Sequence, residues 1–308
     1  MSFAAEVKTE LCRTAPGHLC CARAEAYGVL LYCNAFSPEE IRIMTESEAF
    51  AGRLPRLFQK AFSVRFDREP EKNKSGKYTF QIWDKDKIGH IMDVLGYDRM
   101  TSLSMHINLA ILEEEHCQAA FLRGVFLAGG SMIDPQKRYH MELTTSHLHA
   151  SRELEALLRD MNIQPKSVQR GAYYVIYFKQ SEAIEEILTR IGAPLAAMEL
   201  MNTKLEKDLR NQVNRKLNCD TANLDKSVEA ATRQVEEIRR LAQFGIIDTL
   251  PEKLRETAAK RLLFPELPLS ELAAEFDPPL TKSCLNHRLR KLMEYTEILE
   301  VNHHEQKS

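Results

Sequence analysis

Apolar and small residues fill the stretch 119–134, AAFLRGVFLAGGSMID, and predict a helix that ends at Gly129 and Gly130. Two glycines after a periodic apolar run are typical of a helix C-terminus, because glycine adopts the left-handed cap conformation without steric cost. Gly124 and Ala128 lie four residues apart, so one face of this helix carries little side-chain bulk. We expect a second helix to pack closely against that face.

The hydrophobic pattern of this region occurs twice in the chain. The matched segments are 27–31 with 123–127 (an offset of 96), 41–47 with 139–145, 54–58 with 154–158, 77–83 with 172–178, and 87–96 with 183–192. Their common order predicts two copies of helix, strand or hairpin, helix, hairpin, helix, at about 12–96 and 115–198. We therefore expect a pseudo-symmetric α+β domain over 1–198, with Gly28 facing Gly124 at its seam.

After residue 194 the strand signals stop and the pattern becomes helical. The stretch 199–220 has the composition of a polar, basic connector helix in which asparagine is unusually frequent. Arg210, Asn214 and Arg215 are candidates here for accessory contact with a nucleic-acid backbone or with another domain. A solvated linker is the alternative that this composition leaves open.

A helical domain is predicted over 221–308. Its first helix, 221–244, carries one continuous apolar stripe, which we expect to pack against the helices that follow. The stripe consists of Leu224, Val228, Ala231, Val235, Ile238 and Ala242. Shorter helices then begin at Pro251, near Ser270 and at Thr281, a good N-cap residue.

The last two of these helices are separated by a short break at 277–279. Apolar residues on the third helix predict an inward face made of Leu285, Leu289 and Leu292. A helix, a short turn and a second helix with these spacings are typical of the helix-turn-helix.

The outward face of the third helix is basic, and the chain has no acidic residue between Pro278 and Met293. The N-terminal turns of such a helix reach base edges in the major groove of DNA. Base readout suits the hydrogen-bonding side chains of Ser283, Asn286 and His287. Phosphate contact suits the cations of Lys282, Arg288, Arg290 and Lys291. The alternative is a surface helix that happens to be basic.

Composition limits the classes of function. The 308 residues carry 42 Lys and Arg against 44 Asp and Glu, a net charge of −2. The whole molecule is therefore no general polyanion binder, and any nucleic-acid site is local. Neither a secretory leader pattern nor a membrane-spanning apolar run is present, which favours a cytoplasmic protein without a membrane partner.

Seven cysteines are scattered along the chain, and none forms a C-x-x-C pair. The odd count and the scatter disfavour a disulfide framework. Cys20 and Cys21 are adjacent and have metal-binding chemistry, but the sequence offers no second pair to complete a site. The pattern favours buried thiols, and we expect neither a metal nor a cofactor.

The seam helix resembles the LAGLIDADG helix of homing endonucleases. That resemblance implies duplicated αββαββα halves, with an acidic residue at the end of each seam helix that holds the catalytic metal. Alignment on the shared glycine places Cys33 and Gly129 at those two positions. Glycine offers no ligand and a thiolate is a soft ligand that suits Mg²⁺ poorly. We therefore expect no catalytic residues and no enzyme.

Three segments, LAGGSMIDPQKRYHMEL, NRKLNCDTANLDKSV and DPPLTKSCLNHRLRKL, resemble the WhiA family of bacterial transcription regulators over nearly the whole chain. The resemblance implies a degenerate LAGLIDADG-like domain joined to a helix-turn-helix of the sigma-factor region 4 kind. It also implies control of sporulation or cell-division genes in Gram-positive bacteria. The family's helix-turn-helix segment carries over onto the seven polar residues named above between 282 and 291. Cys284 stands where a small residue is more usual, and we expect it to face inward.

Three hypotheses follow from these patterns. The favoured one is a sequence-specific transcriptional regulator that binds double-stranded DNA at the nucleoid without cutting it. The second is a divergent metal-dependent DNA nuclease, and the third is a scaffold whose duplicated domain binds another transcription regulator or RNA polymerase. The target sequence, the regulated genes and the oligomeric state do not follow from the sequence.

Overall fold

The computed structural model describes residues 2–68, 76–97 and 105–305, and the chain divides into two compact units, 1–208 and 209–308. The first unit is α+β and the second is helical, which confirms the predicted fold class. The division falls inside one helix, α8 (Pro194–Gln243). The finer boundaries expected from the sequence, at 198 and 220, remain predictions.

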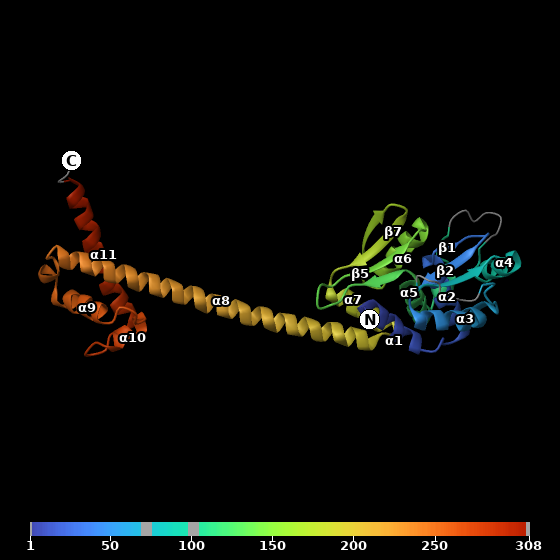
Figure 1. Cartoon of the computed structure of the whole chain (residues 1–308), viewed down its shortest axis with the longest axis horizontal. Helices are drawn as coiled ribbons and strands as arrows, with labels where there is room; N and C mark the ends of the chain where they lie inside the picture. The colour runs from blue at the N-terminus through green and yellow to red at the C-terminus, as the bar shows by residue number, and fades with distance from the viewer. Residues whose placement is uncertain (1, 69–75, 98–104, 306–308) are drawn as a thin grey trace. The chain divides into compact units, whose positions relative to one another are not determined.

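Two copies of one pattern build the first unit after an opening helix α1 (Phe3–Arg13) (Figure 1). The first copy consists of α2 (Leu19–Tyr32), β1 (Ala35–Phe36), β2 (Ile41–Thr45), α3 (Glu48–Phe62), β3 (Tyr78–Ile82) and α4 (Lys85–Val94). A 3₁₀ helix, η1 (Leu109–Leu112), leads to the second copy. That copy consists of α5 (Glu115–Gly129), β4 (Gly130–Met132), β5 (Met141–Thr145), α6 (Leu148–Asp160), β6 (Lys166–Arg170), β7 (Tyr173–Phe178) and α7 (Ser181–Ile191).

The two antiparallel sheets have matching registers. Their strand orders are β1-β2-β3 and β4-β5-β7-β6. The first residue of β2 pairs with the last residue of β3, Ile41 with Ile82, and the same relationship joins Met141 of β5 to Phe178 of β7. The predicted αββαββα pattern is complete in the second copy. In the first, an isolated bridge from Arg68 to Gln81 stands where β6 pairs with β7.

Helices α2 and α5 form the predicted seam, and they approach so closely that glycine is required on both. A Cβ atom on Gly28 would lie 2.2 Å from the carbonyl oxygen of Phe121. A Cβ atom on Gly124 would lie 2.0 Å from the carbonyl oxygen of Glu25. Because each obstacle is backbone, neither contact can relax by a side-chain rotation.

Gly129 and Gly130 end α5 in a different way from the one predicted. The prediction of a left-handed glycine cap is wrong. Gly130, the C-cap residue, has φ −83°, which is not left-handed, and it starts strand β4. Both glycines are instead required by close packing. A Cβ atom on Gly129 would lie 2.4 Å from the carbonyl oxygen of Thr144. A Cβ atom on Gly130 would lie 2.4 Å from the carbonyl oxygen of Phe126.

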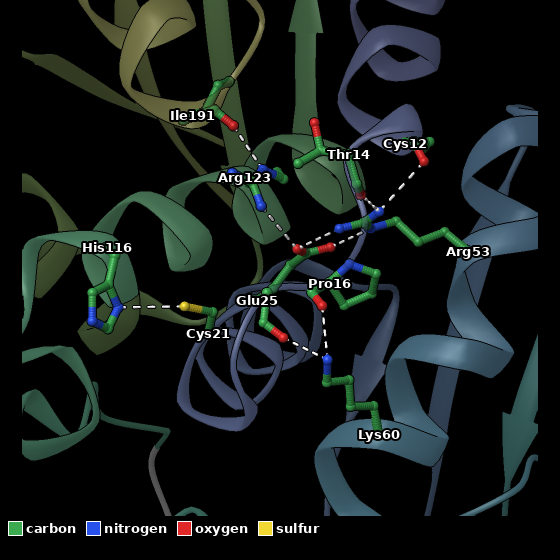
Figure 2. A network of polar contacts seen from close by, with 11 residues as sticks. Cys12, Thr14, Pro16, Cys21, Glu25, Arg53, Lys60, His116, Arg123 and Ile191 are labelled. Atoms are coloured by element: carbon green, nitrogen blue, oxygen red, sulfur yellow. Dashed lines mark hydrogen bonds and ion pairs between the residues drawn. The ribbon is translucent and has the colours of Figure 1, made fainter.

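A buried carboxylate, that of Glu25, holds together a network of polar contacts in this unit (Figure 2). Glu25 of α2 accepts two hydrogen bonds from Arg53 of α3, at 2.5 and 2.8 Å, and a third at 3.3 Å from Arg123 of α5. Arg123 also donates to the carbonyl of Ile191 at the end of α7. Arg53 reaches the carbonyl of Cys12 in α1 and that of Thr14, which follows α1. One charged cluster therefore connects α1, α2, α3, α5 and the end of α7.

Helix α8 is continuous through the stretch where the sequence suggested a connector helix followed by a second helix. No glycine or proline occurs between Leu195 and Gln243, and asparagine costs only a few tenths of a kcal/mol in a helix interior. The asparagine-rich stretch therefore continues the helix.

The apolar stripe expected on 221–244 is only partly buried. Ala231, Val235 and Ile238 are buried, as predicted. Leu224 and Val228 are 61% and 54% exposed, and Ala242 is exposed while Leu241 is buried. The core of the second unit includes Ile238 and Leu241 of α8, and the first two residues of the stripe lie outside it.

The second unit continues from α8 through η2 (Ile247–Thr249), α9 (Glu252–Leu263), α10 (Leu269–Ala274) and α11 (Lys282–Glu305). Its core joins the C-terminal part of α8 to the predicted inward faces of these helices. The core residues on these helices and in the turn before α11 are Leu254, Ala258, Leu272, Ala273, Phe276, Leu285, Leu289 and Leu292. The expected order of helix, turn and helix is confirmed.

The expectation of isolated buried thiols at Cys20 and Cys21 is wrong. Cys20 is exposed, and Cys21 is only half-buried. Both lie in the first turn of α2, and His116 and Cys117 in the first turn of α5 lie beside them. A second pair of residues with metal-ligating side chains, from the other copy of the repeat, therefore lies beside Cys20 and Cys21.

Candidate nucleic-acid interface

Helix α11 is fixed by a cap and by its leucines. Thr281 is the predicted N-cap, and its hydroxyl oxygen accepts a hydrogen bond from the amide of Cys284 at 3.2 Å. Leu285, Leu289 and Leu292 are buried against α9, α10 and the end of α8. Because these residues occupy one stripe of the helix, the opposite stripe faces away from the domain.

Six of the seven residues expected to contact DNA are exposed. They form two adjacent rows with helical i, i+4 spacing, which we call the α11 face. The rows are Lys282, Asn286 and Arg290, and Ser283, His287 and Lys291. Cations, an amide, an imidazole and a hydroxyl therefore share one surface, with no carboxylate in the sequence between 278 and 293.

Arg288 differs from the other six because it packs against its own domain. Its guanidinium lies 3.6 Å from the carboxylate of Glu256 on α9, and 5.9 Å from the ring centroid of Phe276. The side chain is 16% exposed. Arg288 lies three residues after Leu285 and four before Leu292, on the edge of the inward stripe, and that spacing is the sequence signal of its position. Its phosphate-binding role remains a prediction.

Cys284 does not face inward as expected, because it is exposed. It precedes the buried Leu285 by one residue, and successive helical residues are about 100° apart around the axis. The thiol is therefore accessible in the first turn of α11, beside the α11 face.

The candidate accessory residues Arg210, Asn214 and Arg215 are all exposed on α8. Arg210 and Asn214 are four residues apart, so they lie on one face of the helix. Their side chains are accessible to a partner, and their contact with nucleic acid remains a prediction.

Cys33 and Gly129 stand at the C-terminal ends of α2 and α5, where the LAGLIDADG resemblance places catalytic carboxylates. The Cys33 thiol is buried and donates to the carbonyl oxygens of Leu30 and Ala35, each at 3.1 Å. Burial raises the pKa of this thiol to about 12. Cys33 is therefore a neutral thiol engaged with the backbone, which makes it a poor ligand for a hard divalent cation.

A cavity of about 530 Å³ opens beside this end of the seam, between α1, β2 and β4. Among the described residues that line it, Glu46 provides the single carboxylate, and its Oε1 lies 3.4 Å from the Lys77 ammonium. Lys8 of α1 also lines the cavity, and burial lowers its pKa to about 8. A paired carboxylate site for catalytic Mg²⁺ is not formed by these residues.

Comparison with known proteins relates both units to one family. The sequence model of the WhiA LAGLIDADG-like domain matches residues 118–210, and that of the WhiA C-terminal HTH domain matches residues 213–296. A protein named "Probable cell division protein WhiA" from Ruminiclostridium cellulolyticum is 39% identical, over 98% of this chain and 99% of its own. The chain belongs to the WhiA family.

Further relatives agree with this assignment. A WhiA protein of the same name from Clostridium perfringens is 35% identical over 98% of this chain and 99% of its own. The crystal structure of full-length DUF199/WhiA from Thermatoga maritima superposes with a TM-score of 0.60 at 24% identity, over 96% of this chain and 98% of that one. The WhiA fold, a LAGLIDADG-like domain followed by a helix-turn-helix domain, is therefore shared. Among the helices described, none has the length and apolarity that crossing a membrane demands.

Proposed function

We propose that this WhiA-family chain is a sequence-specific DNA-binding transcriptional regulator of cell-division or sporulation genes, without nuclease activity. The observation that supports it most is the α11 face, where two rows of exposed polar and basic side chains follow a capped helix start. A helix of a helix-turn-helix presents such a face to the major groove.

The residue types suggest separate roles on this face. Asn286 has the amide that pairs in bidentate fashion with adenine, and Ser283 and His287 flank it with further hydrogen-bonding groups. Lys282, Arg290 and Lys291 supply cations for phosphates, which set position and give affinity that falls with salt. A protein that binds chromosomal DNA in this way would be located at the nucleoid.

We propose no DNA cleavage because the residues at the C-terminal ends of the seam helices lack the carboxylates that hold a catalytic metal. The end of α2 carries a neutral buried thiol at Cys33, and the end of α5 carries Gly129, which has no side chain. The nearby Glu46 forms an exposed ion pair with Lys77 and has no second carboxylate beside it among the described residues that line the cavity. Because phosphodiester hydrolysis at such a seam needs carboxylates for divalent cations, we expect supercoiled plasmid to stay intact in Mg²⁺ or Mn²⁺.

The proposal has two further parts. Residues of α8 make accessory contacts with DNA, and the protein recruits another regulator or RNA polymerase. Arg210, Asn214 and Arg215 are exposed and suit phosphate contact. The sheet of the second copy carries mixed charge, since Glu142 pairs with both His140 and Arg170. That surface suits a protein partner better than a DNA backbone, because polyanions favour unpaired cations.

Chromatin immunoprecipitation of the intact protein tests this proposal. Wild-type protein is expected to enrich discrete promoter regions, and a Lys282→Ala, Arg290→Ala double variant of equal abundance is expected to lose that enrichment. Uniform recovery of the genome by the wild type, or equal enrichment by the double variant, contradicts the proposal. Retained enrichment by the double variant would favour recruitment through another regulator, which is the scaffold hypothesis.

A further inference from the structure

Four side chains with soft metal ligands converge at the N-terminal ends of the two seam helices. Cys20 and Cys21 lie in the first turn of α2, and His116 and Cys117 lie in the first turn of α5. Their ligand atoms all lie within 4.8 Å of one another. Nδ1 of His116 is 3.3 Å from Sγ of Cys21 and 3.2 Å from Sγ of Cys117, and Figure 2 shows the first of these contacts.

The internal repeat explains why these residues meet. Cys20 and His116 differ by the same 96 positions as Gly28 and Gly124, and so do Cys21 and Cys117. The two seam helices run in the same direction, since their first turns meet at this cluster and Tyr32 at the end of α2 lies beside Gly129 at the end of α5. Equivalent residues of the two copies therefore face each other across the pseudo-twofold axis.

We propose that Cys20, Cys21, His116 and Cys117 bind one Zn²⁺ ion in a tetrahedral Cys₃His site. Zinc takes thiolates at about 2.3 Å and imidazole nitrogen at about 2.0–2.1 Å. In a regular tetrahedron these bond lengths separate two sulfurs by about 3.8 Å and a sulfur from a nitrogen by about 3.6 Å. The separations in the cluster, from 3.2 Å up to 4.8 Å, require ligand shifts of about 1 Å or less to reach that geometry.

Charge and ligand chemistry favour zinc over a hard cation. Three cysteines lose their thiol protons to solvent as three Zn–S bonds form, and His116 binds as neutral imidazole through Nδ1, so no oxidant or reductant takes part. The resulting site has a net charge of −1. The positive ends of two helix dipoles meet there, which suits a site of net negative charge. Mg²⁺ and Ca²⁺ prefer oxygen ligands, and the cluster offers none.

A site with four protein ligands is closed and has no open position for substrate, which makes it structural. It would join the first turns of α2 and α5, at the opposite end of the seam from Cys33 and Gly129. The zinc site is thus distinct from the degenerate nuclease centre. It also does not depend on DNA binding by α11, so each proposal stands or falls by its own test.

The experiment measures metal in the full-length protein, purified with reductant and supplied with zinc. We expect about one zinc per chain after dialysis. Co²⁺ replacing zinc should give the strong visible absorption of tetrahedral cobalt and a near-ultraviolet thiolate-to-cobalt band. Cys20→Ser should lower zinc affinity more than about tenfold. Because Cys20 is exposed, this variant is expected to fold, and circular dichroism verifies that it does.

Cys219→Ser is the matched control, since Cys219 is an exposed cysteine on α8 outside the cluster, and it should bind zinc like the wild type. Cys117→Ser together with His116→Ala should abolish binding, and chelation should lower the melting temperature of the wild type but not of this double variant. The proposal is overturned by wild-type protein without stoichiometric zinc, by zinc binding that survives the cluster substitutions, or by a disulfide among these cysteines found by mass spectrometry in reduced protein.

Discussion

Glu25 of α2 and Arg53 of α3 form a bidentate ion pair whose side chains are 1% and 4% exposed. Arg123 adds a second guanidinium to the same carboxylate (Figure 2). A buried carboxylate is tolerated here because every partner around it is charged or strongly polar. The cluster fixes α3 against the seam and therefore orients the first sheet relative to α2 and α5.

Removing the carboxylate should destabilise the first unit strongly. In Glu25→Ala two largely buried guanidiniums lose their counter-charge, and we expect unfolding free energy to fall by about 3–5 kcal/mol in urea denaturation. Arg190→Ala is the control, because it breaks only the exposed i, i+4 pair with Glu186 and should cost about 0.3–0.5 kcal/mol. Similar losses for both variants would show that the buried pair does not organise the core.

The close approach of α2 and α5 predicts opposite effects of two glycine-to-alanine changes. Gly124→Ala places a methyl group 2.0 Å from backbone, so the helices must separate and stability should fall by about 1–3 kcal/mol or more. Gly52→Ala, in α3 with no atom within 4 Å of the new methyl, should raise stability by about 0.5–1 kcal/mol. The melting temperatures of both variants, measured by thermal unfolding, test this prediction. A Gly124→Ala protein as stable as the wild type would contradict the close approach of α2 and α5.

Arg288 should behave as a stabilising residue of the second unit. Arg288→Ala removes the pair with Glu256 and the contact with Phe276, and we expect a loss of about 1 kcal/mol in the unfolding of that unit. Arg290→Ala, exposed two residues away, should change stability by no more than about 0.5 kcal/mol. If the two variants unfold at the same denaturant concentration, the packing role assigned to Arg288 is wrong.

His147, which precedes α6, should make the folding stability of the protein decrease as the pH falls. Burial lowers its pKa below the usual 6.5, so the folded protein holds the ring neutral. As pH falls below that usual value, the unfolded chain takes up a proton that the folded chain resists, and folding stability declines. His147→Ala should show a smaller loss of unfolding free energy between neutral and mildly acidic pH than the wild type. An identical loss in both proteins would exclude this contribution.

Sequence alone predicted the elements whose signals are local. The duplicated strands were visible because apolar and β-branched residues recur in one order, and the helix-turn-helix was visible from the Thr281 cap and the spacing of Leu285, Leu289 and Leu292. In each case neighbouring residues determine the pattern of a segment, and the repeat follows when two such segments are compared.

Features that depend on distant residues were missed or wrong. The partners of Cys20 and Cys21 lie in the other copy of the repeat, although the shared offset of 96 was available as a signal. Gly129, at the end of α5, is required by the backbone of Thr144 on β5, which no rule based on neighbouring residues reveals. Helix α8 is continuous because nothing inside it breaks a helix, whereas the sequence pattern predicted two helices, over 199–220 and 221–244.

The proposed role of α11 is tested most directly by measuring the DNA affinity of the full-length protein across a salt series. The wild type, Arg290→Ala and Asn286→Ala are compared on a specific site and on a scrambled site. Arg290→Ala should weaken both sites and reduce the salt slope by about one. Asn286→Ala should keep that slope but lose about 1–3 kcal/mol of discrimination. Arg152→Ala, an equal change of charge at an exposed residue of α6, should bind like the wild type. Wild-type binding that is independent of sequence, or α11 variants that match the wild type, would contradict DNA recognition by this helix.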